Sequence, residues 1–87
     1  MAIIKEVTSF PDIKVQIVAS FPDLRVYVTK NKSEAKGSDF IWYFDTSFPD
    51  KKVMFVKSFP DLKVEYVDSK FLAGWKNRSH RLQKRIG

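Results

Sequence analysis

The sequence Ser-Phe-Pro-Asp occurs four times in this chain, and this repeat constrains the fold more than any other feature. The copies span residues 9–12, 20–23, 47–50 and 58–61. The first two copies are 11 residues apart, and so are the last two. Self-similarity at a fixed spacing indicates repeated structural units, none of which can bury its apolar face alone. The chain of 87 residues is therefore expected to form one repeat domain over residues 1–87.

Short runs of alternating apolar and polar residues follow these copies. Residues 13–17 follow the first copy, and similar runs follow the second and the fourth. Asp39 lies 11 residues before Asp50 and precedes a further run at 40–44, after a polar stretch with five inserted residues. Such alternation of β-branched and aromatic residues is typical of half-buried strands. With a first strand near Ile3, the pattern predicts an all-β fold of about six short strands. The apolar positions expected to share the inner faces are Ile13, Val15, Ile17, Leu24, Val26, Val28, Phe40, Trp42, Phe44, Val53, Phe55, Leu62, Val64 and Tyr66.

The Ser-Phe-Pro-Asp copies are expected to form corners between the strands. Proline suits a turn because its φ is fixed, and aspartate can close the turn through its side chain. A residue before proline favours an extended conformation, so we expect each phenylalanine ring to lie over the core. The corner residues are Phe10, Pro11, Asp12, Phe21, Pro22, Asp23, Phe48, Pro49, Asp50, Phe59, Pro60 and Asp61.

Positive charge is concentrated in the C-terminal segment, residues 70–87. The net charge is +6, and residues 1–68 contain equal numbers of acidic and basic side chains. The cations of this segment could contact phosphates while Trp75 stacks on a base; they are Lys76, Arg78, Arg81, Lys84 and Arg85, with Lys70 before them. Alternatively, Trp75 closes the core and the cations form a solvated terminus. Burial of Trp75 favours a structural or protein-interaction module, whereas exposure favours weak, sequence-independent binding of polyanions. Leu82 and Ile86 are four residues apart, which predicts a short C-terminal helix.

Catalytic and cofactor sites are not indicated by the sequence. His80 is the only histidine and has no neighbouring carboxylate or cysteine in the sequence, so we expect a surface or helix-terminal histidine rather than a general base. The corner aspartates offer one carboxylate each, whereas calcium requires several oxygens from one loop. The chain has no cysteine for disulfides or thiolate metal sites, and its start lacks the pattern of a secretory signal. We expect a cytoplasmic monomer of unknown partner that is not an enzyme, has no cofactor and does not cross a membrane.

The repeated strand units, closed by Ala73-Gly74-Trp75-Lys76-Asn77-Arg78-Ser79, resemble the septoil-knot family of small bacterial proteins. The resemblance covers nearly the whole chain, and the Gly-Trp-basic-Asn-basic-Ser run is its most specific part. It implies a compact all-β domain whose backbone forms a deep 7_1 torus knot, with no established biochemical activity. The repeat alone leaves two windings open. One is a coil in which each unit supplies one arm and one corner, and the other is an up-and-down antiparallel meander.

Overall fold

Six parallel strands close into a ring in the computed structural model, which describes residues 3–35, 38–47 and 49–86. The predicted all-β fold is confirmed. The strands are β1 (Ile3–Glu6), β2 (Ile13–Ile17), β3 (Leu24–Val28), β4 (Ile41–Phe44), β5 (Lys51–Phe55), β6 (Leu62–Tyr66) and the short β7 (Gly74–Trp75). The insertion after β3 contains a 3-10 helix, η1 (Lys32–Ala35).

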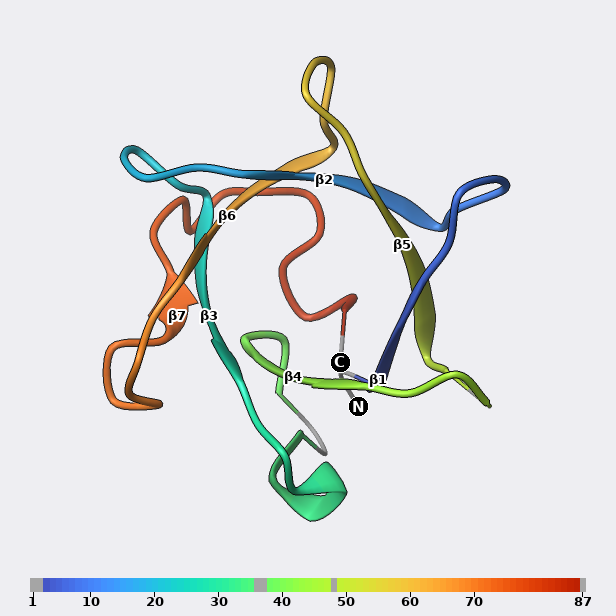
Figure 1. The fold of residues 1–87 in the computed structure, drawn as a ribbon. Coiled ribbons are helices and arrows are strands. Elements are labelled where there is room, and N and C mark those ends of the chain that lie inside the picture. The colour runs from blue at the N-terminus through green and yellow to red at the C-terminus, as the bar shows by residue number, and fades with distance from the viewer. Residues whose placement is uncertain (1–2, 36–37, 48, 87) are drawn as a thin grey trace.

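Strands that are consecutive in the sequence are mostly not neighbours in the ring. The order is β4-β1-β5-β2-β6-β3, and β3 also pairs with β4, which closes the sheet. The strands of the second half therefore lie between those of the first half (Figure 1). Each unit supplies one arm and one corner of a coil, so the antiparallel meander is excluded. The short β7 adds to β3 in antiparallel orientation and is the last strand of the sheet order.

Each of the six ring strands pairs with two ring neighbours in succession along its length. In β2, residues 13–15 pair with β5 and residues 15–17 pair with β6. This stagger leaves the last residue of several strands at the edge of the ring, where the chain turns outward. Ile17, Val28 and Tyr66 are 45%, 40% and 41% exposed, so their predicted inward placement is wrong.

The core is formed by the other positions of the predicted inner faces. The buried members of that set are Ile13, Val15, Leu24, Val26, Trp42, Val53, Leu62 and Val64, and Phe40, Phe44 and Phe55 pack partly buried against them. Ile4 and Ile86 complete this core. The alternation of the sequence therefore predicted the interior correctly wherever a strand is covered on its inner side.

The last part of the C-terminal segment, red in Figure 1, lies across the inside of the ring in that view, whereas β7 lies beside β3. Ile86 is buried in the core and Leu82 packs against it, but no helix connects them. The backbone forms successive four-residue turns instead, with Gln83 N–H donating to His80 carbonyl and Arg85 N–H donating to Leu82 carbonyl. The predicted C-terminal helix is therefore wrong, because turns also place Leu82 and Ile86 on the core. Within the described residues, no helix has the length and apolar character needed to cross a membrane.

Candidate interaction surface

Three corner loops are each closed at their base by the strand that they cross. Val7 N–H donates to Val53 carbonyl and Asp12 N–H donates to Lys52 carbonyl, both at 2.8 Å. Because both ends of the loop are bound to adjacent residues of β5, the residues between them must leave the ring and turn back. The same pair of bonds recurs for Val18 and Asp23 on β6, and for Val56 and Asp61 on β2. The loops project outward as the points of a star (Figure 1).

The corner aspartates bind strands that are distant in the sequence. The Oδ2 atom of Asp12 accepts a hydrogen bond of 2.8 Å from Lys52 N–H. Equivalent bonds join Asp23 to Lys63 at 2.9 Å, Asp61 to Lys14 at 2.9 Å and Asp50 to Ile3 at 3.2 Å. The prediction that aspartate closes its own turn is therefore wrong. Each carboxylate instead fixes a crossing of the chain over a strand 40 or 47 residues away.

The phenylalanines of the described corners point into solvent. Phe10, Phe21 and Phe59 are 88%, 92% and 91% exposed as residues, so the prediction that their rings cover the core is wrong. Both ends of each loop are bound to adjacent residues of the strand that the loop crosses. The phenylalanine at the tip therefore lies outside the ring, and its side chain does not reach the core. Phe48 of the remaining copy lies outside the described residues. We call Phe10, Phe21 and Phe59 the phenylalanine tips.

The backbone at the phenylalanine tips is in the left-handed region. The φ angle is 53° at all three residues, where the sequence predicted an extended conformation. This region costs a non-glycine residue about 1–2 kcal/mol, and a following proline restricts the residue further. Glycine would remove the steric cost, yet each described tip carries an aromatic residue. The tips combine backbone strain with almost complete exposure of an apolar ring, so the rings are available for contact and contribute little to the core.

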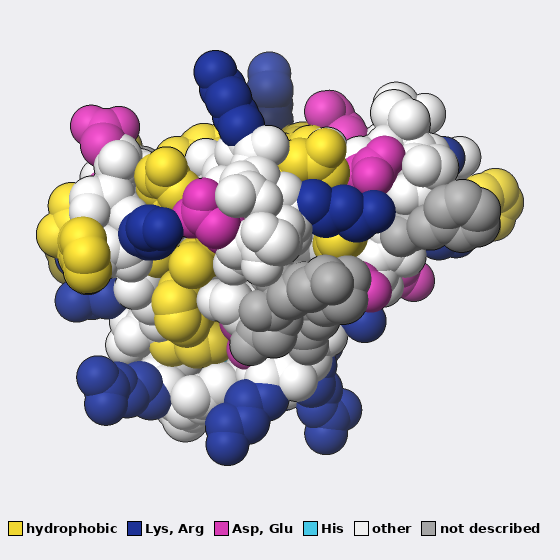
Figure 2. Space-filling view, turned by 90° about the horizontal axis from the view of Figure 1, so that it is seen from below, with side chains coloured by type: hydrophobic (Ala, Val, Ile, Leu, Met, Phe, Trp, Pro, Cys, Tyr) yellow, Lys and Arg dark blue, Asp and Glu magenta, His cyan; other side chains and the backbone are white. Residues whose placement is uncertain are grey.

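The basic residues of the C-terminal segment do not form one cluster. Lys70 pairs with Glu34 at 2.7 Å and Arg81 pairs with Asp61 at 3.0 Å. The hydrogen bond and the charge of each partner raise the pKa of Lys70 and lower that of Glu34. In the described part of the chain, no ion pair involves the exposed Lys76, Arg78, Lys84 or Arg85. Figure 2 shows Lys and Arg side chains projecting at the upper, left and lower margins of one face, and others lying beside acidic side chains in its middle.

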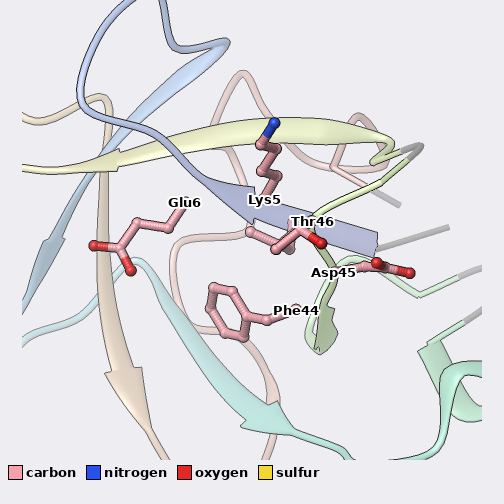
Figure 3. A pocket seen from close by; sticks show the side chains of 6 residues that line it. Lys5, Glu6, Phe44, Asp45 and Thr46 are labelled. Atoms are coloured by element: carbon pink, nitrogen blue, oxygen red, sulfur yellow. The ribbon is translucent and has the colours of Figure 1, made fainter.

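Several shallow hollows lie between the corners and the strands. One of about 440 Å³ is bordered by Glu6, Phe44 and Asp45, and its Lys5 and Glu6 side chains point in different directions (Figure 3). Another of about 360 Å³ brings Arg25 of β3 together with Lys76 and Arg78. Arg25 was not identified from the sequence as a site residue, because it belongs to a repeat position that is a cation in three strands. Among the described residues, no group of three or more acidic or imidazole side chains is placed to hold a metal ion.

The interleaved parallel ring with its repeated corners agrees with a comparison against protein families, in which the 7(1) septoil knot domain matches residues 1–76. The chain belongs to the septoil knot domain family. Its fold is therefore a knotted β fold, as the resemblance implied. Among curated proteins, none matches the chain.

The septoil knot match ends at Lys76, and the segment beyond it is fastened to the ring by Asp39. The carboxylate of this buried residue accepts hydrogen bonds from Ile86 N–H at 3.1 Å, from Lys84 N–H and from the Trp75 indole at 3.1 Å. Asp39 occupies the repeat position of the corner aspartates, so the same residue type here binds the C-terminal segment. That role was not predicted, although the 11-residue spacing identifies the position.

Trp75 and His80 pack against each other at the base of this segment in the septoil knot protein. Their rings stack with centroids 5.6 Å apart, and Trp75 is half-buried against the core. His80 Nδ1 accepts from Leu82 N–H at 3.1 Å, so Nε2 carries the hydrogen and donates to Asp61 carbonyl at 3.0 Å. The fold also brings the Asp23 carboxylate to 3.7 Å from Nε2. The expected placement of His80 on the surface is therefore wrong, since its side chain is 11% exposed, and the carboxylate beside it is distant in the sequence and is brought there because two corners meet.

Proposed function

We propose that this septoil knot protein is a protein-interaction module that binds partners through its phenylalanine tips. The observation that carries the proposal is the combination of exposure near 90% with a left-handed φ at Phe10, Phe21 and Phe59. An exposed aromatic ring gains much from burial against another protein, and aromatic residues are enriched in the centres of interfaces. Strained backbone conformations occur often at functional sites, so a role in binding accounts for the strain at the phenylalanine tips, which do not pack in the core.

The arrangement of the tips suits binding to several partner sites at once. The corner loops project in different directions around the ring (Figure 1), so one flat surface does not contact all of them. Each loop is fixed at its base by two backbone hydrogen bonds. A rigid tip loses little conformational entropy on binding, which favours affinity.

The working form that we infer is a cytoplasmic monomer that acts without catalysis or a cofactor. The net charge of +6 supports a monomer, since copies of like charge repel each other. His80 supports the absence of catalysis, because both ring nitrogens are engaged in hydrogen bonds that hold the C-terminal segment.

Site-specific photocrosslinking tests the proposal in cells of the source organism. The photoreactive residue p-benzoylphenylalanine replaces Phe10, Phe21 or Phe59 in turn, and replaces the exposed Ser33 of η1 as the matched control. We expect discrete protein adducts from the tip positions and none from Ser33. Adducts of equal yield from Ser33, or no adducts from any tip, would contradict the proposal.

A second candidate function is weak, sequence-independent binding of polyanions by the C-terminal segment. Lys76, Arg78, Lys84 and Arg85 support it, because none of them has an ion-pair partner among the described residues. The stacking of Trp75 on His80 leaves that indole less suited to stack on a base. Such binding would therefore be electrostatic alone, and weaker than that of proteins that add aromatic stacking.

A further inference from the structure

Two adjoining hollows meet beside the Phe21 tip. The first, of about 360 Å³, lies where β3 and β7 meet the C-terminal segment, and the second, of about 500 Å³, lies under the corner loop 18–23. Arg25 and Lys76 line both hollows and therefore form their common wall. A ligand long enough to occupy one hollow can reach the other past these two cations.

The first hollow has the chemistry of an anion site. Arg25, Lys76 and Arg78 contribute cations, and Gln83 contributes an amide. Arg25 gives one N–H to Glu65 at 2.9 Å, but a guanidinium has five such donors and this side chain is 38% exposed. Lys76 and Arg78 are exposed and have no ion pair within the described residues. A carboxylate placed here would be surrounded by hydrogen-bond donors.

The second hollow offers apolar surface next to that site. Ala19, Phe21 and Pro22 line it together with the polar Asn77. The Phe21 ring is 92% exposed and stands at its border. An apolar side chain of a ligand that entered this hollow would cover one face of the Phe21 ring. The side chain and the ring would then shield each other from water, which favours binding.

The acidic neighbours of the cations favour a peptide over a nucleic acid as the occupant. Glu65 lines the second hollow, and Glu65 and Asp68 line a third hollow that also contains Arg25. A polyanion would bring its successive phosphates close to these carboxylates, whereas one isolated carboxylate can avoid them. The sheet order also ends at β7, so no further strand among the described residues pairs with its outer edge. An extended chain can therefore approach the backbone there, as peptides do at sheet edges.

We propose that these two hollows bind an extended acidic segment of a partner protein, with one carboxylate at Lys76 and Arg78 and one apolar side chain against Phe21 and Pro22. This inference rests on the proposed function and assigns a class of partner to one of its tips. Selectivity would come from the spacing between the acidic and the apolar side chain, because the shared wall of Arg25 and Lys76 separates their sites.

The test is a fluorescence-anisotropy titration with a labelled glycine-serine peptide that carries one glutamate and one leucine. The double variant Lys76→Gln/Arg78→Gln should raise the Kd about tenfold, and Phe21→Ala should raise it about fivefold. The matched controls are Lys84→Gln/Arg85→Gln, which removes the same charge elsewhere, and Phe59→Ala, which removes an equivalent tip. Both controls should leave the Kd within about twofold. Far-UV circular dichroism and urea midpoints establish that each variant is folded.

Three results would overturn the inference. They are an absence of peptide binding, an equal loss of affinity in both charge variants, and a labelled oligothymidylate that binds more tightly than the peptide and depends on Phe21. Either of the first two results would show that the hollows are not a specific peptide site. The third would show that they bind nucleic acid instead. If photocrosslinking at Phe10 and Phe59 still gives adducts while the peptide does not bind, this inference fails and the proposed function stands.

Discussion

Asp12 and Lys52 are joined by two hydrogen bonds that run in opposite directions. Asp12 N–H donates to Lys52 carbonyl, and Lys52 N–H donates to the Asp12 carboxylate, both at 2.8 Å. This reciprocal pair fixes the point at which one corner crosses β5, and it recurs at Asp23 with Lys63 and at Asp61 with Lys14.

We expect Asp12→Ala to lower the free energy of unfolding by about 1 kcal/mol, because Lys52 N–H loses its acceptor. Asp12→Asn should lose less, since the amide oxygen can still accept that bond. Equilibrium urea unfolding measures both variants, and Asp68→Ala serves as the control because its side chain is exposed. A loss in the control as large as that in Asp12→Ala would argue against a role for the crossing bond.

Phe59→Gly should leave the protein at least as stable as Phe59→Ala, and we expect it to be more stable by about 1 kcal/mol. The reason is that glycine adopts a φ of 53° without steric cost, while alanine keeps the strain. Neither variant should lose the roughly 3–5 kcal/mol that follows deletion of a buried phenylalanine. Urea midpoints of the two variants and the parent provide the comparison. A loss of several kcal/mol in both variants would indicate a ring buried in solution.

Asp39→Ala should destabilise the protein by about 3 kcal/mol, since three N–H groups lose their charged acceptor in a buried site. Release of the C-terminal segment should also expose Trp75 and shift tryptophan emission to longer wavelength. Asp39→Asn should retain part of the stability, because its amide has one acceptor oxygen. Unchanged emission together with unchanged stability in Asp39→Ala would show that the segment is held by other contacts.

Unfolding should be slow for a β domain of this size, because a knotted chain must withdraw through its own windings and the pairings are non-local. Stopped-flow and manual-mixing experiments in increasing denaturant give the unfolding rate. Complete and reversible unfolding within about one second in moderate denaturant would speak against a deep knot.

Binding of a labelled oligothymidylate should be micromolar or weaker near physiological salt. The plot of log K against log salt should have a slope no steeper than about 3, because four unpaired cations each contribute about 0.7 for a single strand. Lys84→Gln/Arg85→Gln should reduce that slope by about 1.4, because two cations are removed. A titration at several salt concentrations checks this, and a chain ending after Asn77 should bind less than the full chain. Equal binding by the full and shortened chains would place the contact outside the C-terminal segment.

The strands were predictable from the sequence because alternation reports which side of a strand is covered. Val15 and Val64 alternate with Lys14 and Lys63, and the structure buries the valines and exposes the lysines. The winding was not predictable, since a parallel coil and a meander require the same alternation. Only the resemblance carried by the Gly74–Ser79 run pointed to the knot.

The predictions for the corner residues were wrong because they considered only contacts within each turn, whereas the corner aspartates bind strands that are distant in the sequence. Asp12 has the residue type of a turn-closing aspartate, but its partner is 40 residues away. Phe10 was expected to have an extended backbone because it precedes Pro11. Its φ angle is instead in the left-handed region, in a loop whose two ends are bound to adjacent residues of β5. In the hollow of about 360 Å³, Lys76 and Arg78 were identified as candidates from their charge in the sequence. Arg25 could be added to them only once the pairing of β3 with β7 was known.

The interleaved strand order has a consequence for how the protein is made. Among the residues that the structure describes, β1, β2 and β3 have no pairing with one another and pair only with strands from Ile41 onward. During synthesis the amino-terminal half therefore leaves the ribosome without any strand partner. Its apolar side chains remain exposed to solvent until β4, β5 and β6 have been synthesised. We expect a nascent chain stopped before residue 41 to be unfolded and open to proteases or chaperones, so that the ring assembles only after most of the polypeptide has been translated.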